Sequence, residues 1–286
     1  MQETAMNQAS FIKTIYDYYL LHKRSFPWRD VDNPYYVLVS EIMLQQTQTY
    51  RVEPKFAGFI AQFPTLESLA SAPLSAVLAA WQGLGYNRRA KFLHQAACQI
   101  VAQHEGSVPC DPAVLQQLPG IGAATAASIS AFAYNTPTVF IETNIRAVYI
   151  HFFFPDRSDV HDRELLPLIE QTLDCVSPRQ WYYALMDYGV MLKKTQVNPS
   201  RKSKHHTKQS RFVGSTRQVR GAVLRALLTH HHLPLPALQA AVRDDIKRLV
   251  SIDALQSIVD TLVQEEILQC QELSWQGELC WTVSKT

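Results

Sequence analysis

The sequence predicts a mainly helical protein that ends in a small winged-helix-like module. Three observations support this prediction: a helical spacing of apolar residues through most of the first 190 positions, a polar and basic segment near residue 200, and a changed pattern after it. The chain has 286 residues, of which 47% are hydrophobic and 18% charged. This composition is typical of a globular protein of about two domains, and it excludes disordered, collagen-like and coiled-coil chains.

The first 190 residues form a series of predicted helices. Apolar side chains such as Phe11 and Ile15 recur on one helical face, and the same spacing returns near residues 37–44 and 74–81. Proline or glycine interrupts this spacing at residues 26–27, 33–34, 83–85 and 109–112. An all-helical region is therefore expected here.

Residues 197–216 form a polar, basic segment with almost no hydrophobic side chains. A solvated tether and an arm that contacts nucleic acid both fit this composition. We therefore expect a helical domain over residues 1–196, this linker or arm, and a C-terminal domain over residues 217–286.

The C-terminal domain shows the order of a winged-helix module. Helical patterns occur at residues 219–228, 236–242 and 254–267, and strand patterns follow at residues 268–275 and 278–283. Gln276-Gly277 between the two strands is a hairpin signal. Modules of this order bind DNA in some proteins and only other proteins elsewhere, so the order alone assigns no function.

The formal net charge of +2 conceals an uneven distribution of charge. Eleven Lys or Arg and no Asp or Glu lie between Tyr188 and Arg243, whereas the rest of the chain has a net charge of −9. A basic segment of this kind attracts phosphate groups.

Other residue usage predicts a cytoplasmic protein without metal. The five cysteines contain no CxxC pair, which favours reduced thiols over a disulfide framework. The histidines at 205–206 and 230–232 have no Cys or carboxylate at ligand spacing. No apolar run is long enough to cross a membrane, and the first ten residues lack the pattern of a signal peptide.

Residues 118–122, Leu-Pro-Gly-Ile-Gly, lie between two helical stretches. Gly120 and Gly122 allow a tight turn that exposes backbone N–H groups, and the following helix adds its positive N-terminal end. A simple turn between packed helices is one interpretation. The flanking helices favour the other, a helix-hairpin-helix element that grips a DNA phosphate without reading base sequence.

Two glutamates are candidates for catalysis. Glu41 stands in an apolar helical stretch, where an unpaired carboxylate is unfavourable, so it is either functional or part of a structural ion pair. Glu142 precedes a new helix, with Asn144 close behind. On residue type alone, Glu142 is a charge that the helix dipole favours.

Four segments together resemble the helix-hairpin-helix DNA glycosylases of the endonuclease III-like superfamily, and among them the MutY-type adenine glycosylases. The segments are NPYYVLVSEIMLQQTQ (33–48), WQGLGYNRRA (81–90), LPGIGAATA (118–126) and MDYGVML (186–192). The match covers about residues 10–195, and SEIMLQQTQ is its most specific part. It implies a two-lobed helical helix-hairpin-helix DNA glycosylase fold, which the pattern after residue 217 extends with a C-terminal winged-helix-like module.

The resemblance implies a monofunctional DNA glycosylase of base excision repair, which extrudes a mismatched adenine opposite 8-oxoguanine or guanine and hydrolyses its N-glycosidic bond. Glu41 would be the acid that protonates the leaving adenine, with a pKa raised by its apolar neighbours. Glu142 takes the place of the family's catalytic Asp, which stabilises the cationic sugar and helps to orient or activate water, and Asn144 supports that carboxylate. We expect a bacterial monomer that acts on double-stranded DNA with a mismatch or lesion and associates with the nucleoid.

The resemblance also assigns residues around the base and the DNA backbone. Those expected to line the base pocket or to wedge into the base stack are Gln45, Gln46, Tyr86, Ala124 and Asp187. Those expected to bind phosphate are Leu118, Gly120, Ile121, Gly122, Thr125 and Arg88, and the basic segment adds Lys202, Lys204 and Lys208.

Several departures from the family pattern bear on function. Glu142 has one methylene more than the family's Asp, which can displace a carboxylate by roughly 1 Å. Ala124 stands where bifunctional relatives have a Schiff-base lysine, so we expect no β-lyase activity. The last 70 residues differ from the NUDIX-like domain that many MutY proteins use to sense 8-oxoguanine.

The family's iron–sulfur cluster is not expected in this chain. Its four cysteines correspond by spacing to Lys193, Ser200, Ser203 and Gln209, none of which supplies a thiolate. No cofactor is therefore predicted.

Two alternatives to a mismatched-adenine glycosylase remain. One is a glycosylase of the same fold for another base, such as thymine or uracil opposite guanine, or a deaminated or damaged purine. The other is a DNA-binding or regulatory protein in which the chemistry has weakened.

Overall fold

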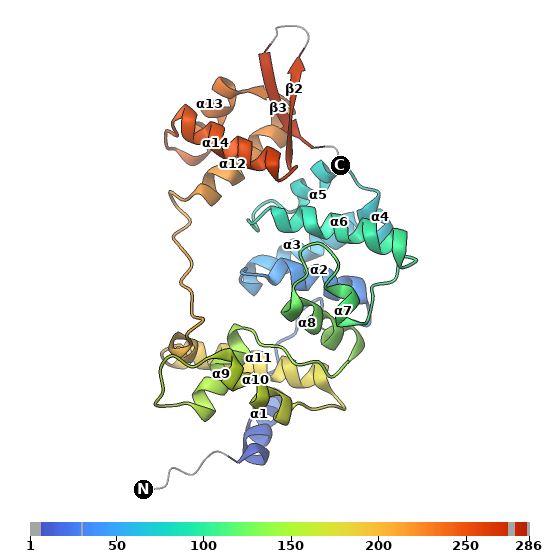
Figure 1. Ribbon diagram of the computed structural model, residues 1–286, viewed down its shortest axis with the longest axis vertical. Helices are drawn as coiled ribbons and strands as arrows, with labels where there is room; N and C mark the ends of the chain where they lie inside the picture. Colours follow the sequence, from blue (N-terminus) through green and yellow to red (C-terminus); the bar gives the residue numbers. More distant parts are fainter. Residues whose placement is uncertain (1–6, 30, 274–277, 285–286) are drawn as a thin grey trace. The chain divides into compact units, whose positions relative to one another are not determined.

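The protein is mainly helical, as the sequence predicted. The computed structural model describes residues 7–29, 31–273 and 278–284 (Figure 1). The helices are α1 (Gln8–His22), α2 (Pro34–Leu44), α3 (Thr49–Gln62), α4 (Leu66–Ala70), α5 (Leu74–Ala80), α6 (Arg88–Gln103), α7 (Pro112–Leu115), α8 (Ala123–Tyr134), α9 (Thr143–Phe153), α10 (Asp162–Thr172), α11 (Pro178–Thr195), η1 (Pro199–Lys202), α12 (Thr216–His230), α13 (Leu235–Ile246) and α14 (Ile252–Gln264). The strands are β1 (Leu233–Pro234), β2 (Leu268–Leu273) and β3 (Glu278–Val283).

The chain divides into two compact units. The first unit comprises Met1–Glu41, Val108–Gln117 and Ile121–Lys208, and the second comprises Ile42–Ser107, Leu118–Gly120 and Gln209–Thr286. The C-terminal helices therefore share a unit with residues 42–107. The expected division of domains at residues 196 and 217 stays a prediction.

Aromatic packing and one close helix contact organise the first unit. Phe11 of α1 is fully buried, and its ring centroid lies 5.2 Å from that of Tyr149 in α9 and 5.9 Å from that of Trp181 in α11. A Cβ atom at Gly189 of α11 would lie 2.5 Å from the backbone oxygen of Asn144. Because no side chain fits there, glycine allows α11 to lie directly against the start of α9.

Helix α2 is apolar on nearly all sides, which explains why it is buried. Asn33 begins the helix, since its side-chain oxygen accepts the backbone N–H of Tyr35 at 3.0 Å. Leu38, Val39 and Met43 are fully buried. The helix therefore places Glu41 in apolar surroundings, as its sequence indicated.

The C-terminal residues of the second unit confirm the predicted winged-helix-like order. Helices α12, α13 and α14 precede β2 and β3, which pair antiparallel with Leu268 opposite Val283. The sheet order is β1-β3-β2, and the sequence analysis missed β1 because a strand of two residues has no detectable periodicity. The predicted turn at Gln276-Gly277 lies outside the described residues.

Within the predicted tether or arm over residues 197–216, residues 198–204 are packed within the first unit, so a solvated tether is wrong for this part, whereas contact with nucleic acid stays a prediction. Asn198 accepts the backbone N–H of Ser200 at 3.0 Å and starts η1. Val160 then pairs with this segment, because its N–H donates to the Lys202 oxygen and its oxygen accepts the Lys204 N–H, both at 3.0 Å. Ser200 and Ser203 are buried. Short polar side chains here satisfy the backbone of a packed turn.

The helices within the described ranges include none that is both long enough and apolar enough to cross a membrane.

Replacing Gly189 with alanine is expected to destabilise the protein by about 1–3 kcal/mol, because the new Cβ forces α9 and α11 apart. Thermal denaturation followed by circular dichroism measures the change. Gly58→Ala in α3 is the matched control, since a Cβ there meets nothing within 4 Å and alanine favours a helix. Equal melting temperatures for the two variants would contradict the close contact.

Candidate active site

Glu41 is a half-buried residue of α2. The hydroxyl of Ser128 in α8 lies 2.5 Å from Glu41 Oε2 and 3.0 Å from the backbone oxygen of Thr125. A serine has one proton, so it cannot donate to both acceptors at once. When Glu41 is protonated, its O–H donates to Ser128 and Ser128 donates to Thr125, which satisfies all three groups.

The pKa of Glu41 is raised from 4.5 to about 7, chiefly because burial disfavours the charged carboxylate. The Ser128 hydrogen bond and the Arg29 guanidinium act to lower this pKa, whereas the Glu142 carboxylate raises it. A large share of Glu41 is therefore protonated near neutral pH. A carboxyl group in this state can give a proton to a bound molecule.

Glu142 is the N-cap of α9. Its Oε1 accepts the backbone N–H groups of Asn144 at 2.8 Å and Ile145 at 2.9 Å, and its Oε2 accepts Asn144 Nδ2 at 3.1 Å. The interpretation of Glu142 as a helix-terminal charge is therefore confirmed. The three N–H donors also fix the direction of the carboxylate, which a negative group that acts on a cation requires.

Asp187 is buried in α11 and holds two arginines. Arg24 donates its backbone N–H and Nε to the Asp187 carboxylate, and Arg29 donates from Nη1 and Nη2, over distances of 2.7–3.0 Å. Both carboxylate oxygens are therefore occupied. Arg29 is one of the groups that act on the pKa of Glu41, so Asp187 reaches the candidate site through Arg29.

Lys193 of α11 joins the Glu142 cluster, which sequence reasoning did not anticipate. Its ammonium group donates to Asn144 Oδ1 at 2.9 Å, and Asn144 in turn donates to Glu142. Lys193 is half-buried, and burial lowers the pKa of its ammonium group.

The residues at the positions expected for cluster cysteines do not fit an iron–sulfur cluster. Lys193 binds Asn144, the Ser200 hydroxyl donates to Asn198 at 2.7 Å, and Ser203 is buried within the packed turn. None of these side chains is a thiolate. Over the described part of the chain, no group of three or more His, Cys, Asp or Glu side chains is placed to hold a metal ion.

The predicted phosphate site begins α8. Gly120 has a φ of +75°, and a Cβ at this position would lie 2.8 Å from Phe92, so the turn requires glycine. Leu118 and Ile121 are buried and anchor the turn, whereas Gly122 is exposed. The N-cap residue of α8 is Gly122, which has no side chain to accept an N–H group of the helix start, and a helix N-terminus of this kind favours an anion.

Ala124 and Thr125 occupy the first turn of α8. Ala124 is exposed and lies one helical turn before Ser128, so both residues belong to the same face of the helix. Thr125 is half-buried and supplies the oxygen near the Ser128 hydroxyl.

The expected wedge residues lie in the second unit, on strained turns. Gln46 has a φ of 53° and Tyr86 a φ of 49°, a left-handed conformation that is uncommon for residues other than glycine. Arg89 is buried and stabilises these turns, because Nη1 donates to the Gln45 oxygen at 2.6 Å and Nη2 to the Gly85 oxygen at 3.2 Å. Strain of this kind is concentrated at functional sites.

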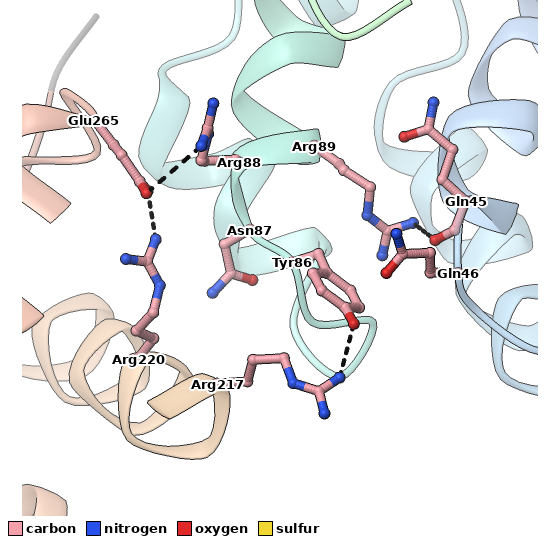
Figure 2. Close-up of a pocket in the computed structure, with 9 residues that line it drawn as sticks. All are labelled: Gln45, Gln46, Tyr86, Asn87, Arg88, Arg89, Arg217, Arg220 and Glu265. Carbon is pink, nitrogen blue, oxygen red and sulfur yellow. Dashed lines mark hydrogen bonds and ion pairs between the residues drawn. The ribbon is translucent and has the colours of Figure 1, made fainter. Parts of the chain in front are cut away.

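A pocket of about 380 Å³ lies beside these turns (Figure 2). It is lined by Gln45, Gln46, Tyr86, Asn87, Arg88, Arg89, Arg217, Arg220 and Glu265. Glu265 binds Arg220 and lies 4.0 Å from Arg88. Four arginines against one carboxylate give the pocket a net positive charge.

Figure 2 shows how Arg217 of α12 holds Tyr86. Arg217 Nη1 donates to the Tyr86 hydroxyl at 2.8 Å, and its Nη2 donates to the backbone oxygen of Ser210 at 2.6 Å. Gln209 also donates to the Tyr86 hydroxyl. Sequence reasoning missed Arg217, although its position in the acid-free stretch was the signal that could have indicated it.

The expected phosphate-binding side chains of the basic segment and of α6 are largely exposed. These residues are Arg88, Lys202, Lys204 and Lys208. Lys202 donates to the backbone oxygen of Pro155, and Arg88 lies over the ring of Phe92. Their role in DNA binding stays a prediction.

Comparison with known proteins places these residues in a family context. The family described as HhH-GPD superfamily base excision DNA repair protein matches residues 39–170. The chain is 32% identical over 278 residues to the adenine DNA glycosylase of Mycolicibacterium smegmatis, a match that covers 90% of this chain and 93% of that protein.

Two further matches agree. The adenine DNA glycosylase of Buchnera aphidicola is 32% identical over 192 residues, which are 65% of this chain and 54% of that protein, so the match spans about half of the Buchnera enzyme. A solved structure of a thermostable thymine-DNA glycosylase matches with a TM-score of 0.59 and 23% identity, over 68% of this chain and 91% of that one. At this identity the structural match shows the shared fold.

The raised pKa of Glu41 predicts a pH-dependent stability difference. The Glu41 carboxyl has a pKa of about 7 in the folded state and 4.5 in the unfolded state, so between these pH values the folded protein holds a proton that the unfolded chain has released. The free energy of unfolding therefore decreases as pH rises from about 4.5 through 7. Glu41→Gln has no such proton to release. We expect this variant to gain stability over the wild type by up to about 3 kcal/mol between pH 4.5 and 8.

Urea denaturation at several pH values measures this difference. Glu170→Gln on the exposed face of α10 provides the baseline for loss of one carboxyl. A difference between Glu41→Gln and wild type that does not change with pH would contradict the raised pKa.

Proposed function

Because the chain belongs to the adenine DNA glycosylases of the HhH-GPD superfamily, we propose that it removes mispaired adenine from double-stranded DNA in base excision repair. The targets are adenine opposite 8-oxoguanine or opposite guanine. The observation on which this proposal rests is a carboxylic acid, Glu41, that is partly protonated at neutral pH and lies in the same unit as the fixed carboxylate of Glu142. Two carboxyl groups with separate protonation states suit cleavage of a glycosidic bond.

Glu41 is proposed to supply the proton to the leaving base. The adenine is turned out of the duplex, and Glu41 protonates a ring nitrogen of the base. The C1′–N9 bond then breaks, and its electron pair stays on adenine. Adenine leaves as a neutral molecule because the proton compensates the charge that it would otherwise carry.

Glu142 is proposed to stabilise the sugar cation that remains. Its carboxylate is fixed by Asn144 and Ile145, so it does not reorganise as positive charge develops at C1′. A water molecule attacks C1′ and passes one proton to the Glu142 carboxylate, which releases it to solvent and leaves a neutral sugar at the abasic site. Glu41 takes up a proton from solvent and returns to its starting state. This sequence forms no covalent enzyme intermediate.

The DNA backbone is proposed to bind the exposed start of α8, and the strained turns of Gln46 and Tyr86 to enter the base stack. The arginines of the pocket beside Tyr86 attract the same polyanion. We further propose that the protein works without an iron–sulfur cluster and without β-lyase activity. Ala124 offers no amine for a Schiff base.

A panel of duplexes tests the proposed function. Each duplex carries one adenine opposite 8-oxoguanine, adenine opposite guanine, thymine or uracil opposite guanine, or a deaminated purine, and alkali converts abasic sites into strand breaks. Strand breaks confined to the two adenine mismatches support the proposal. Breaks at another base indicate a different target, bound but uncut duplexes indicate a DNA-binding protein, and breaks without alkali indicate lyase activity.

Glu41→Gln is expected to lower the single-turnover rate of base release by about 10²–10⁴-fold, because the amide has no proton to donate. Its affinity for the duplex should stay within about twofold of the wild type, since no phosphate contact changes. The wild-type rate should fall as pH rises through about 7, where Glu41 loses its proton. Full turnover by the variant would remove Glu41 from the mechanism.

Replacing Lys202, Lys204 and Lys208 together with alanine tests the basic segment. If the segment contacts phosphates, the slope of log affinity against log salt should fall by up to about three units. Fluorescence anisotropy with a labelled duplex gives this slope. An unchanged slope would identify the segment as a connection that makes no contact with DNA.

A further inference from the structure

We propose that Lys193 positions the Glu142 carboxylate through Asn144, as a residue that acts on catalysis without touching the reacting atoms. This inference rests on the proposed function of Glu142. It assigns a role to a lysine at the position where the family resemblance expects the first thiolate of a metal cluster. In this chain the ammonium group of Lys193 then helps to orient the Glu142 carboxylate.

The backbone geometry brings Lys193 to Asn144. Gly189 allows α11 to contact Asn144, because its missing Cβ leaves room for the Asn144 backbone oxygen. Lys193 follows Gly189 by one helical turn and therefore lies on the same face of α11. Its side chain reaches Asn144 Oδ1 at 2.9 Å.

The contact determines which way the Asn144 amide faces. An ammonium group can only donate hydrogen bonds, and a carboxylate can only accept them. With Oδ1 directed at Lys193, Nδ2 must face Glu142, and it lies 3.1 Å from Oε2. Without Lys193, the amide loses the partner that opposes its rotation.

Glu142 depends on this support more than a shorter side chain would. Its extra methylene adds a rotatable bond compared with aspartate, so the carboxylate has more conformations available. The backbone N–H groups of Asn144 and Ile145 hold Oε1 only. Asn144 Nδ2 holds Oε2 and removes rotation of the carboxylate about its last bond.

The charge of Lys193 also suits this place. Asp162 pairs with the neighbouring Arg146 through two contacts of 2.8 Å. The charge of Arg146 is thus compensated by Asp162. Lys193 adds a positive charge near Glu142 in a half-buried setting, where electrostatic interactions are stronger than in water.

The test compares Lys193→Met with Lys194→Met. Lys194 is the next residue of α11 and is exposed, so its replacement removes the same charge without the Asn144 contact. We expect Lys193→Met to slow single-turnover base release by about 10–100-fold, as a carboxylate displaced by about 1 Å would. Affinity for the duplex should change no more than in Lys194→Met, and Lys193→Arg should recover most of the rate.

A spectroscopic readout is independent of activity. In ¹⁵N-labelled protein, the side-chain amide signals of Asn144 should shift in Lys193→Met and stay in place in Lys194→Met. In the wild type, the Lys193 ammonium protons should show a cross-relaxation signal to the Asn144 side chain. This second measurement needs no variant and so applies even if Lys193→Met does not fold.

The outcomes separate the inference from the proposed function. Wild-type protein that releases no base from any duplex would overturn the proposed function, and the role in catalysis falls with it, although the amide signals would still report the contact. Base release that is unchanged in Lys193→Met would overturn the positioning role. Absence of the cross-relaxation signal in the wild type would also overturn it.

Discussion

The contact of α11 with the start of α9 at Gly189 is the constraint on which the first unit depends. Two residues before this glycine, Asp187 fixes Arg24 and Arg29, and Arg29 acts on the pKa of Glu41. One turn after it, Lys193 reaches Asn144 and through it Glu142. Two different faces of a single helix thus contact groups that act on both carboxyl groups. A shift of α11 would disturb the two groups together, which explains why a glycine is needed where a larger residue would pack more strongly.

The two carboxyl groups, of Glu41 and Glu142, have different surroundings. Glu41 is half-buried in an apolar helix, and its hydrogen bond with Ser128 is compatible with either protonation state. Glu142 instead receives three N–H groups at a helix start, which favour a negative charge. The Glu142 charge raises the pKa of Glu41 in turn. The Glu142 carboxylate thus acts in the same direction as burial on the Glu41 proton.

The helical architecture and both glutamates could be predicted, because each is evident from residues that are close together in the sequence. Apolar periodicity identifies α2, and a carboxylate within it is conspicuous. The residues that tune the site were not predictable in this way. Ser128 is 87 residues from Glu41, Lys193 is 49 from Asn144 and Arg217 is 131 from Tyr86, so only the folded chain brings them together. The packed turn at residues 198–204 was missed because its short polar residues also fit a solvated linker.

The acid-free stretch between Tyr188 and Arg243 was first evident only as an imbalance of charge. Its basic residues have distinct local environments. Lys193 supports a carboxylate in the first unit, whereas Arg217 holds Tyr86 in the second, and Lys204 and Lys208 remain exposed. An acidic side chain beside Lys193 or Arg217 would compete for the donors that these contacts use. Exclusion of Asp and Glu from the stretch therefore has a local reason at each of these two places, in addition to the general attraction between positive charge and DNA.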